Sequence, residues 1–245
     1  MGLITAFLDA LFDPSKDSRN RFKGAAGEAK SALGLGLFLP DEYIILNNIT
    51  LPTDQGTTQI DHIVVSPHGI HVVEGKAVNG TIYGSADDLY WTVFLGGKKH
   101  QLHNPLIQNR GHIKALMTAL ALPESAFHSV VFFSSEKCRF KTRMPENVLT
   151  EGLIGFIKRE QRVLFSDEEV TAIIKKINHT RLEKSAATDQ AHIANVQHRF
   201  QAKHQAGDPC PACAEGKLVP RTAKASGAQF LGCERFPRCR YRESL

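Results

Sequence analysis

Residues 59–76 read QIDHIVVSPHGIHVVEGK, and this stretch decides the fold. Two runs rich in Val and Ile flank Pro67-His68, which predicts two antiparallel strands joined by a tight turn. Both strands are apolar on both faces apart from a few charged residues. The hairpin therefore predicts a sheet that is covered on both sides.

The rest of the body alternates between strand and helix patterns. Further strand patterns span 43–51, 79–103 and 128–134. Helix patterns span 105–122 and 167–184, with Asn104 and Ser166 as the expected N-caps.

The two ends of this body carry weaker patterns. A helix is expected over 17–37, and a short amphipathic helix within 1–16 either docks on the core or lies on a membrane surface. Residues 185–207 are polar and rich in Ala, Gln and His, which predicts a linker or a loose helix.

The charged residues within the hairpin are Asp61, Glu74 and Lys76. Glu74 and Lys76 are two residues apart, so they share one face of their strand. A two-residue loop would set Asp61 opposite Glu74, whereas a three-residue loop would shift the register by one. Two close carboxylates need a neutralising partner, and hard oxygen ligands suit Mg²⁺ or Mn²⁺. The pattern fits either metal-assisted phosphodiester hydrolysis or an ordinary ion pair on a strand.

Four of the five cysteines form the pattern C-x2-C-x19-C-x5-C near the C-terminus. Cysteines two apart can both reach one ion, and a second pair completes a tetrahedron. A disulfide framework is the alternative, but it suits an oxidising compartment and the chain shows no export signal. We therefore predict one zinc ion held by Cys210, Cys213, Cys233 and Cys239.

The net charge of +5 is unevenly distributed. Residues 1–198 contain 21 basic and 21 acidic side chains, whereas residues 199–245 contain nine basic and four acidic ones. A basic tail on a neutral body indicates a polyanionic partner. No stretch approaches the roughly 18 apolar residues of a membrane span, so we expect a cytoplasmic protein.

Several motifs resemble the nuclease-related domain (NERD) family in order and spacing. They are GAAGE (24–28), the hairpin at 59–76, NGTIYG (79–84), Trp91 and NPLIQ (104–108). This family belongs to the PD-(D/E)xK, restriction-endonuclease-like superfamily. The resemblance covers roughly residues 20–125 and implies an α/β core with a central mixed sheet flanked by helices.

The same resemblance implies a catalytic set. Its members are Asp61, Glu74 and Lys76, with Glu28 and Gln108 as helical accessories. The carbonyl of Gly75 is a further candidate metal ligand beside Asp61 and Glu74. From the residues alone, Glu28 and Gln108 fit exposed helix positions equally well.

The cysteine segment resembles the C-terminal zinc finger of bacterial type I topoisomerases. The matching motifs are CPAC (210–213) and FLGCERFPRC (230–239). Those modules are zinc ribbons that bind single-stranded DNA, so arginines are expected at phosphates and an aromatic ring at the bases. The expected DNA-binding residues are Arg235, Arg238, Arg240, Tyr241 and Arg242.

These observations predict four segments: a helix at 1–16, a nuclease-related domain at 17–184, a linker at 185–207 and a zinc ribbon at 208–245. The expected function is an Mg²⁺- or Mn²⁺-dependent deoxyribonuclease whose ribbon grips single-stranded DNA in bacterial DNA processing or defence. The alternative is a non-catalytic DNA-binding protein with a vestigial nuclease core.

Overall fold

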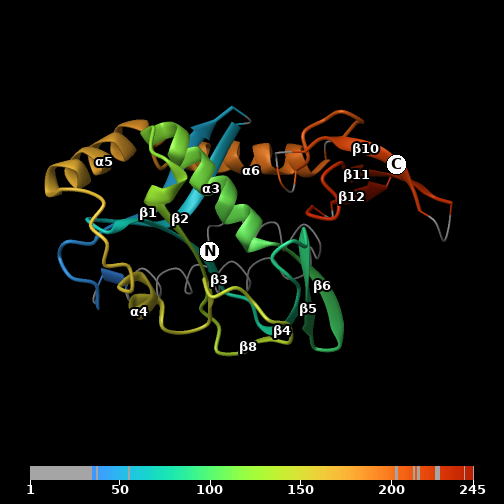
Figure 1. Cartoon of the computed structure of the whole chain (residues 1–245), viewed down its shortest axis with the longest axis horizontal. Coiled ribbons are helices and arrows are strands. Elements are labelled where there is room, and N and C mark those ends of the chain that lie inside the picture. The colour runs from blue at the N-terminus through green and yellow to red at the C-terminus, as the bar shows by residue number, and fades with distance from the viewer. Residues whose placement is uncertain are drawn as a thin grey trace.

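The computed structural model describes residues 35–36, 38–54, 56–201, 204–211, 213, 216–223, 227–239 and 241–244. The helix expected within 1–16 and the GAAGE motif with Glu28 lie outside these residues, as does most of the helix expected over 17–37. The described chain forms two packed sheets flanked by helices, followed by a small C-terminal sheet (Figure 1). Within these residues, no helix combines the length and apolarity needed to cross a bilayer.

The central sheet has five strands in the order β1-β2-β3-β7-β9. They are β1 (Ile44–Thr53), β2 (Gly56–Ser66), β3 (Gly69–Lys76), β7 (Phe127–Phe133) and β9 (Val148–Leu149). β1, β2 and β3 pair antiparallel, whereas β7 runs parallel to β3 and β9 runs parallel to β7. The expected mixed sheet is confirmed.

The turn between β2 and β3 contains two residues, because Ser66 pairs with Gly69. Gly69 has φ +123°, and a Cβ atom there would lie 2.6 Å from Nε2 of His128. Only glycine fits this position without strain. The two-residue loop settles the register that the sequence left open.

A second sheet of four strands, in the order β6-β5-β4-β8, packs beside the first. Its strands are β4 (Gly80–Tyr83), β5 (Tyr90–Leu95), β6 (Lys98–His103) and β8 (Cys138–Phe140). Trp91 is fully buried on its inner face, where its ring stacks 6.2 Å from that of Phe133. The sheet is thereby joined to the central core through β7.

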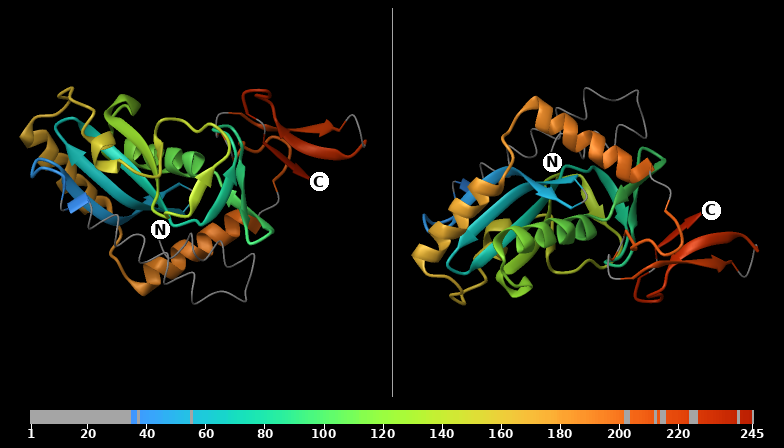
Figure 2. Two further views of the ribbon diagram at one scale, coloured as in Figure 1. Left: turned by 90° about the horizontal axis from the view of Figure 1, so that it is seen from below. Right: turned by 90° about the horizontal axis from the view of Figure 1, so that it is seen from above.

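Helices cover both faces of the central sheet (Figure 2). They are α3 (Pro105–Leu120), α4 (Leu153–Ile157), α5 (Asp167–Thr180) and α6 (Ala186–Gln201), with a 3-10 turn at Glu124–Ala126. α3 and α5 share one apolar core with β1, β2 and β3, whereas α4 packs on the opposite face. The expected caps are confirmed: the Asn104 side chain accepts from the amide of Leu106, and Ser166 forms a capping box with Glu169.

Residues 185–207 contain helix α6, which docks on the body. His192 is buried, and its Nδ1 lies 2.6 Å from Oγ1 of Thr57 in β2. Thr58, the next residue, is bonded to His112 of α3. Because neighbouring residues of a strand point to opposite faces, α3 and α6 cover opposite sides of β2.

The C-terminal unit is a three-stranded antiparallel sheet made of β10 (Leu218–Thr222), β11 (Gln229–Cys233) and β12 (Arg242–Ser244). Its small core contains Leu218, Leu231 and Tyr241 besides cysteines. Leu89 and Ile107 of the body pack against this core. The unit is therefore docked beside the start of α3.

His71 in β3 makes the stability of the fold sensitive to acid. The buried His71 ring lies 4.6 Å from that of His128, and burial, reinforced by His128 and His68, lowers the pKa of His71 to about 3. In the unfolded chain this pKa is about 6.5. Between these two pKa values the unfolded chain binds a proton at His71 that the folded chain does not bind. The contribution of His71 to the free energy of unfolding is therefore fully present above about pH 6.5 and is lost as pH falls towards 3.

Replacing His71 by Gln is therefore expected to reduce the slope with which the free energy of unfolding decreases as pH falls. Urea unfolding at pH 6.5, 5.5 and 4.5 measures the effect, which is expected to reach roughly 1 kcal/mol per pH unit. The exposed His179 of α5, replaced by Gln, is the control and should leave the slope unchanged. Equal slopes in wild type and the His71 variant would contradict the assignment.

Candidate active site and zinc centre

The middle of the central sheet carries the acidic residues of the hairpin. In the register of β2 and β3, His62 pairs with Val73, so the next residues, Asp61 and Glu74, lie opposite one another. The ladder ends there, and the amide of Gly75 donates to Oδ2 of Asp61 at 2.9 Å. Asp61 is 3% exposed. Its carboxylate is therefore held against the backbone between Glu74 and Lys76.

Glu74 and Lys76 point toward α3 and form a buried ion pair. Nζ of Lys76 donates to Oε1 of Glu74 at 2.5 Å and to Oε1 of Gln108 at 3.0 Å. Oε2 of Glu74 lies 3.1 Å from Nε2 of His112. The structure therefore brings together Glu74, Lys76 and Gln108, with Asp61 next to them along β2.

Electrostatics keep Glu74 ionised. Burial raises the pKa of Glu74, but Lys76 and His112 outweigh this effect and lower it to about 2. A buried charge of this kind is stable only when it is paired and hydrogen-bonded. The Glu74 carboxyl group is thus ionised at neutral pH.

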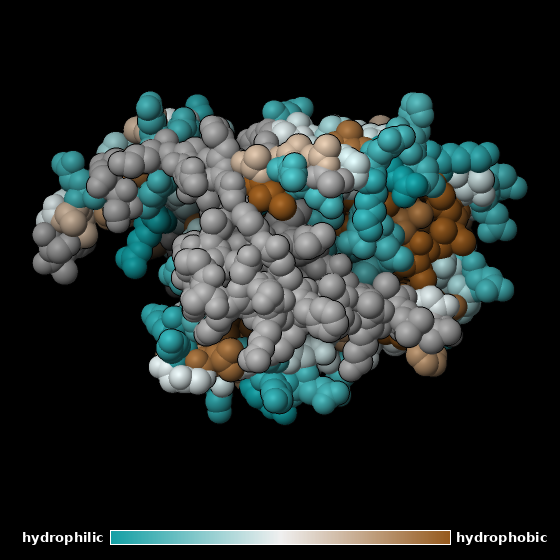
Figure 3. Space-filling model, turned by 180° about the vertical axis from the view of Figure 1, so that it is seen from behind, coloured by the Kyte–Doolittle hydropathy of each residue, from teal (hydrophilic) through white to brown (hydrophobic). Residues whose placement is uncertain are grey.

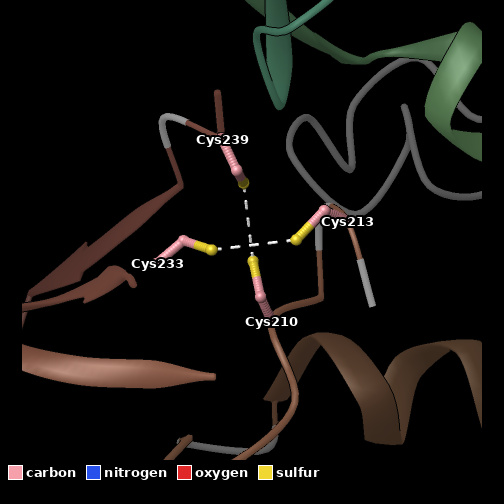
Figure 4. Close-up of side chains that lie close together, drawn as sticks. All are labelled: Cys210, Cys213, Cys233 and Cys239. Carbon is pink, nitrogen blue, oxygen red and sulfur yellow. Dashed lines mark hydrogen bonds between the residues drawn. The ribbon is translucent and has the colours of Figure 1, made fainter. Parts of the chain in front are cut away.

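The second cluster is the set of four C-terminal cysteines, whose sulfur atoms all lie within 4.8 Å of one another. They converge on one point (Figure 4), and Sγ atoms are 3.7 Å apart both between Cys210 and Cys239 and between Cys213 and Cys233. A tetrahedral zinc site with Zn–S distances of about 2.3 Å separates its sulfurs by about 3.8 Å. The geometry fits zinc, and none of these cysteines forms a disulfide.

Comparison with known proteins finds matches to two parts of the chain. Residues 23–134 match the family model of the nuclease-related domain. Residues 207–245 match the model of the topoisomerase DNA binding C4 zinc finger, so the C-terminal unit is similar to that zinc ribbon.

One relative shares part of this chain. A protein of Bacillus anthracis described as uncharacterized is 41% identical over 115 residues, which make up 46% of this chain and 54% of the relative. The chain thus spans about half the length of the curated relative it matches. No solved structure matches the chain.

The region that matches the nuclease-related domain contains oxygen atoms that could bind a hard divalent cation. Two ionisable carboxyl groups, Asp61 and Glu74, come from adjacent strands, are almost fully buried and flank the backbone of Gly75. Carboxylate and carbonyl oxygens are the ligands that Mg²⁺ and Mn²⁺ prefer. These residues therefore fit the cation that the nuclease family implies.

His112 is a residue of this site that the sequence analysis missed. It is buried in α3, four residues after Gln108, so both side chains reach the Glu74–Lys76 pair from one helix face. Its Nδ1 lies 2.7 Å from Oγ1 of Thr58. His112 is thus a positioning residue for Glu74, and its spacing from Gln108 was the signal that could have revealed it.

One residue expected at the DNA is buried in the ribbon. Tyr241 is 8% exposed, packs in the ribbon core and donates its hydroxyl to Oε2 of Glu243 at 2.6 Å. Burial, reinforced by Glu243, raises the pKa of Tyr241. The Tyr241 ring is therefore part of the small core of the ribbon.

The other ribbon residues differ in exposure. Arg238 and Arg242 are exposed, Arg235 is partly exposed, and Arg240 lies outside the described residues. Phe236 is 60% exposed, and the Arg221 guanidinium lies 5.9 Å from its ring centre. Phe236 is therefore the exposed aromatic ring that the ribbon offers in its described part.

Proposed function

We propose that this protein is an Mg²⁺- or Mn²⁺-dependent deoxyribonuclease whose zinc ribbon binds single-stranded DNA. The observation that carries the proposal is the convergence of Glu74, Lys76 and Gln108, with Asp61 beside them, inside a nuclease-related domain. An acid pair and a lysine in one buried cluster suit phosphodiester hydrolysis.

Each residue has a role that follows from its contacts. Asp61, Glu74 and the Gly75 carbonyl would hold the cation, which when bound supplies charge neutralisation and an activated water. Lys76 is held by Glu74 and Gln108, where its ammonium group would stabilise negative charge developing on a phosphate. Glu28 stays a proposed accessory of this set.

The ribbon is proposed to hold the DNA strand. Three of its described arginines, Arg235, Arg238 and Arg242, would contact phosphates together with Arg240, and Phe236 would supply the stacking ring. The ribbon core packs on Ile107, the residue before Gln108. A strand held by the ribbon would thus lie on the side of the domain where α3 begins.

Domain limits and setting belong to the same proposal. We assign residues 17–184 to the nuclease unit, because α5 shares the core of the central sheet with α3. Residues 185–207 connect it to the ribbon at 208–245. A DNA substrate and four zinc-binding thiolates favour the bacterial cytoplasm, with a role in DNA processing or defence.

A second candidate function is DNA binding without cleavage. It is favoured by one observation: both carboxylate oxygens of Glu74 already have protein partners, Lys76 and His112. A cation would have to compete with the Lys76 ammonium group for Oε1.

Incubation with labelled nucleic acids separates the two candidates. The purified protein is expected to cleave single-stranded DNA with Mg²⁺ or Mn²⁺ and to leave it intact with EDTA. Duplex DNA and RNA of the same sequence test the substrate, and Glu74→Gln is the control for a contaminating nuclease. Binding of DNA without cleavage under every metal condition would contradict the nuclease and support the second candidate.

A further inference from the structure

The outer face of the second sheet has no part in either site. Alternation in β4, β5 and β6 sends Ile82, Trp91, Val93 and Leu102 into the core. The residues between them point away from it and expose large rings. Tyr83 is 41%, Tyr90 39% and Phe94 44% exposed. We call the residues listed next the outer face: Thr81, Tyr83, Tyr90, Thr92, Phe94, Lys99, Gln101, His103 and Arg139.

The strand register arranges this outer face in rows. One row across the four strands consists of Lys99, Phe94, Thr81 and Arg139. A basic side chain therefore lies at each edge of the sheet. Tyr83 is in the next row, and its ring centre lies 5.5 Å from that of Phe94 at an interplanar angle of 80°. The face thus has exposed rings in the middle and basic side chains at its edges.

The charge of the outer face has one sign. The charged residues of the outer face are Lys99 and Arg139, and its four strands contain no Asp or Glu. Lys98 pairs with Leu95 and belongs to the other face of the sheet. The guanidinium of Arg139 donates to the carbonyls of Glu136 and Cys138, so the exposed Lys99 beside the β5–β6 turn is the more accessible charge. Figure 3, a view from behind, shows hydrophobic residues beside hydrophilic ones at its lower left.

The outer face also continues toward the zinc ribbon. Tyr90 and His103 form its last row, with ring centres 5.7 Å apart. Leu89, the neighbour of Tyr90, packs against the ribbon core. The ribbon, which matches a DNA-binding zinc finger, therefore adjoins one end of this row of rings.

We propose that the outer face binds single-stranded nucleic acid, with bases stacked on Tyr83 and Phe94 and a phosphate at Lys99. The ligand is single-stranded because only unpaired bases expose the faces that aromatic rings stack on. The positive charges of Lys99 and Arg139 complement its phosphate backbone. The proposal rests on the proposed function for its substrate, a DNA strand that reaches the nuclease domain along the ribbon.

Fluorescence anisotropy with a labelled oligothymidylate tests the proposal. The full-length, zinc-loaded protein is titrated in EDTA-free buffer without Mg²⁺ or Mn²⁺, so that cleavage does not interfere and the ribbon keeps its zinc. Combining Phe94→Ala with Tyr83→Ala is expected to weaken binding roughly 10- to 100-fold, because one base stack is lost at each ring. Lys99→Gln is expected to reduce the slope of log affinity against log salt by about 0.7.

Two controls accompany these variants. Phe38→Ala removes another exposed phenylalanine, 67% exposed and outside the outer face, and should leave affinity unchanged. Trp91 is the only tryptophan of the chain and lies buried beneath the outer face, so its emission reports whether the sheet is intact. If the emission of Trp91 shows that the double variant is unfolded, the proposal is tested with the exposed Lys99→Gln variant alone, through its slope of log affinity against log salt.

The outcomes separate this proposal from the proposed nuclease. Weakened binding in the ring variants supports the outer face even if the wild type cleaves nothing. Unchanged affinity and salt slope in folded variants overturn it even if the wild type cleaves DNA. Loss of self-association in the ring variants, with DNA affinity unchanged, would also overturn it and identify a contact between copies of the chain.

Discussion

Replacing Lys76 by Met is expected to lower the rate of DNA cleavage roughly 100- to 1000-fold at saturating DNA. The variant keeps the length of the side chain and removes the positive charge proposed to stabilise the phosphate in the transition state. Rates measured with Mg²⁺ and with Mn²⁺ check this expectation. The exposed Lys114 on α3, replaced by Met, is the matched control and should cleave like the wild type.

Burial complicates this variant, and the design has to account for it. Glu74 and Lys76 are each 1% exposed and are hydrogen-bonded to one another. Removing one charge therefore leaves the other charge buried without its partner. Breaking such a pair costs about 3–5 kcal/mol. The double variant Glu74→Gln with Lys76→Met leaves no unpaired charge and is expected to be more stable than Lys76→Met and equally inactive. Wild-type cleavage by either variant would mean that other residues carry the chemistry.

Replacing Cys233 by Ser is expected to abolish zinc binding and unfold the ribbon. The module has few apolar residues, and in zinc-finger peptides the bound metal contributes about 10–16 kcal/mol to folding. Elemental analysis should find one zinc per wild-type chain and none in the variant. Amide exchange should rise throughout 207–245 and at Leu89 and Ile107, which pack against the ribbon core.

Cys138 provides the matched control for this experiment. It is buried in β8 outside the zinc cluster, and burial raises the pKa of its thiol to about 11. Cys138→Ser should therefore keep one zinc per chain. Reduced, freshly purified wild-type protein without zinc would contradict the assignment.

Local signals in the sequence predicted most of the described elements. Asn104 followed by Pro105 predicted the start of α3, and Ser166 predicted that of α5, because a capping residue acts on amides two or three positions away. The strand patterns around Pro67-His68 and the cysteine spacing depend on equally short distances along the chain. The catalytic roles of Asp61, Glu74 and Lys76 stay predictions.

The sequence by itself thus determined the hairpin, the helix caps and the four zinc ligands, because each depends on residues that are neighbours along the chain or repeat at short spacing. Only the tertiary structure placed His112 against Glu74, 38 residues away, and buried Tyr241 in the ribbon core. It also gathered Tyr83, Phe94 and Lys99 on one face of the second sheet. These outcomes depend on which surfaces pack together, and packing is decided by the whole chain rather than by any local pattern.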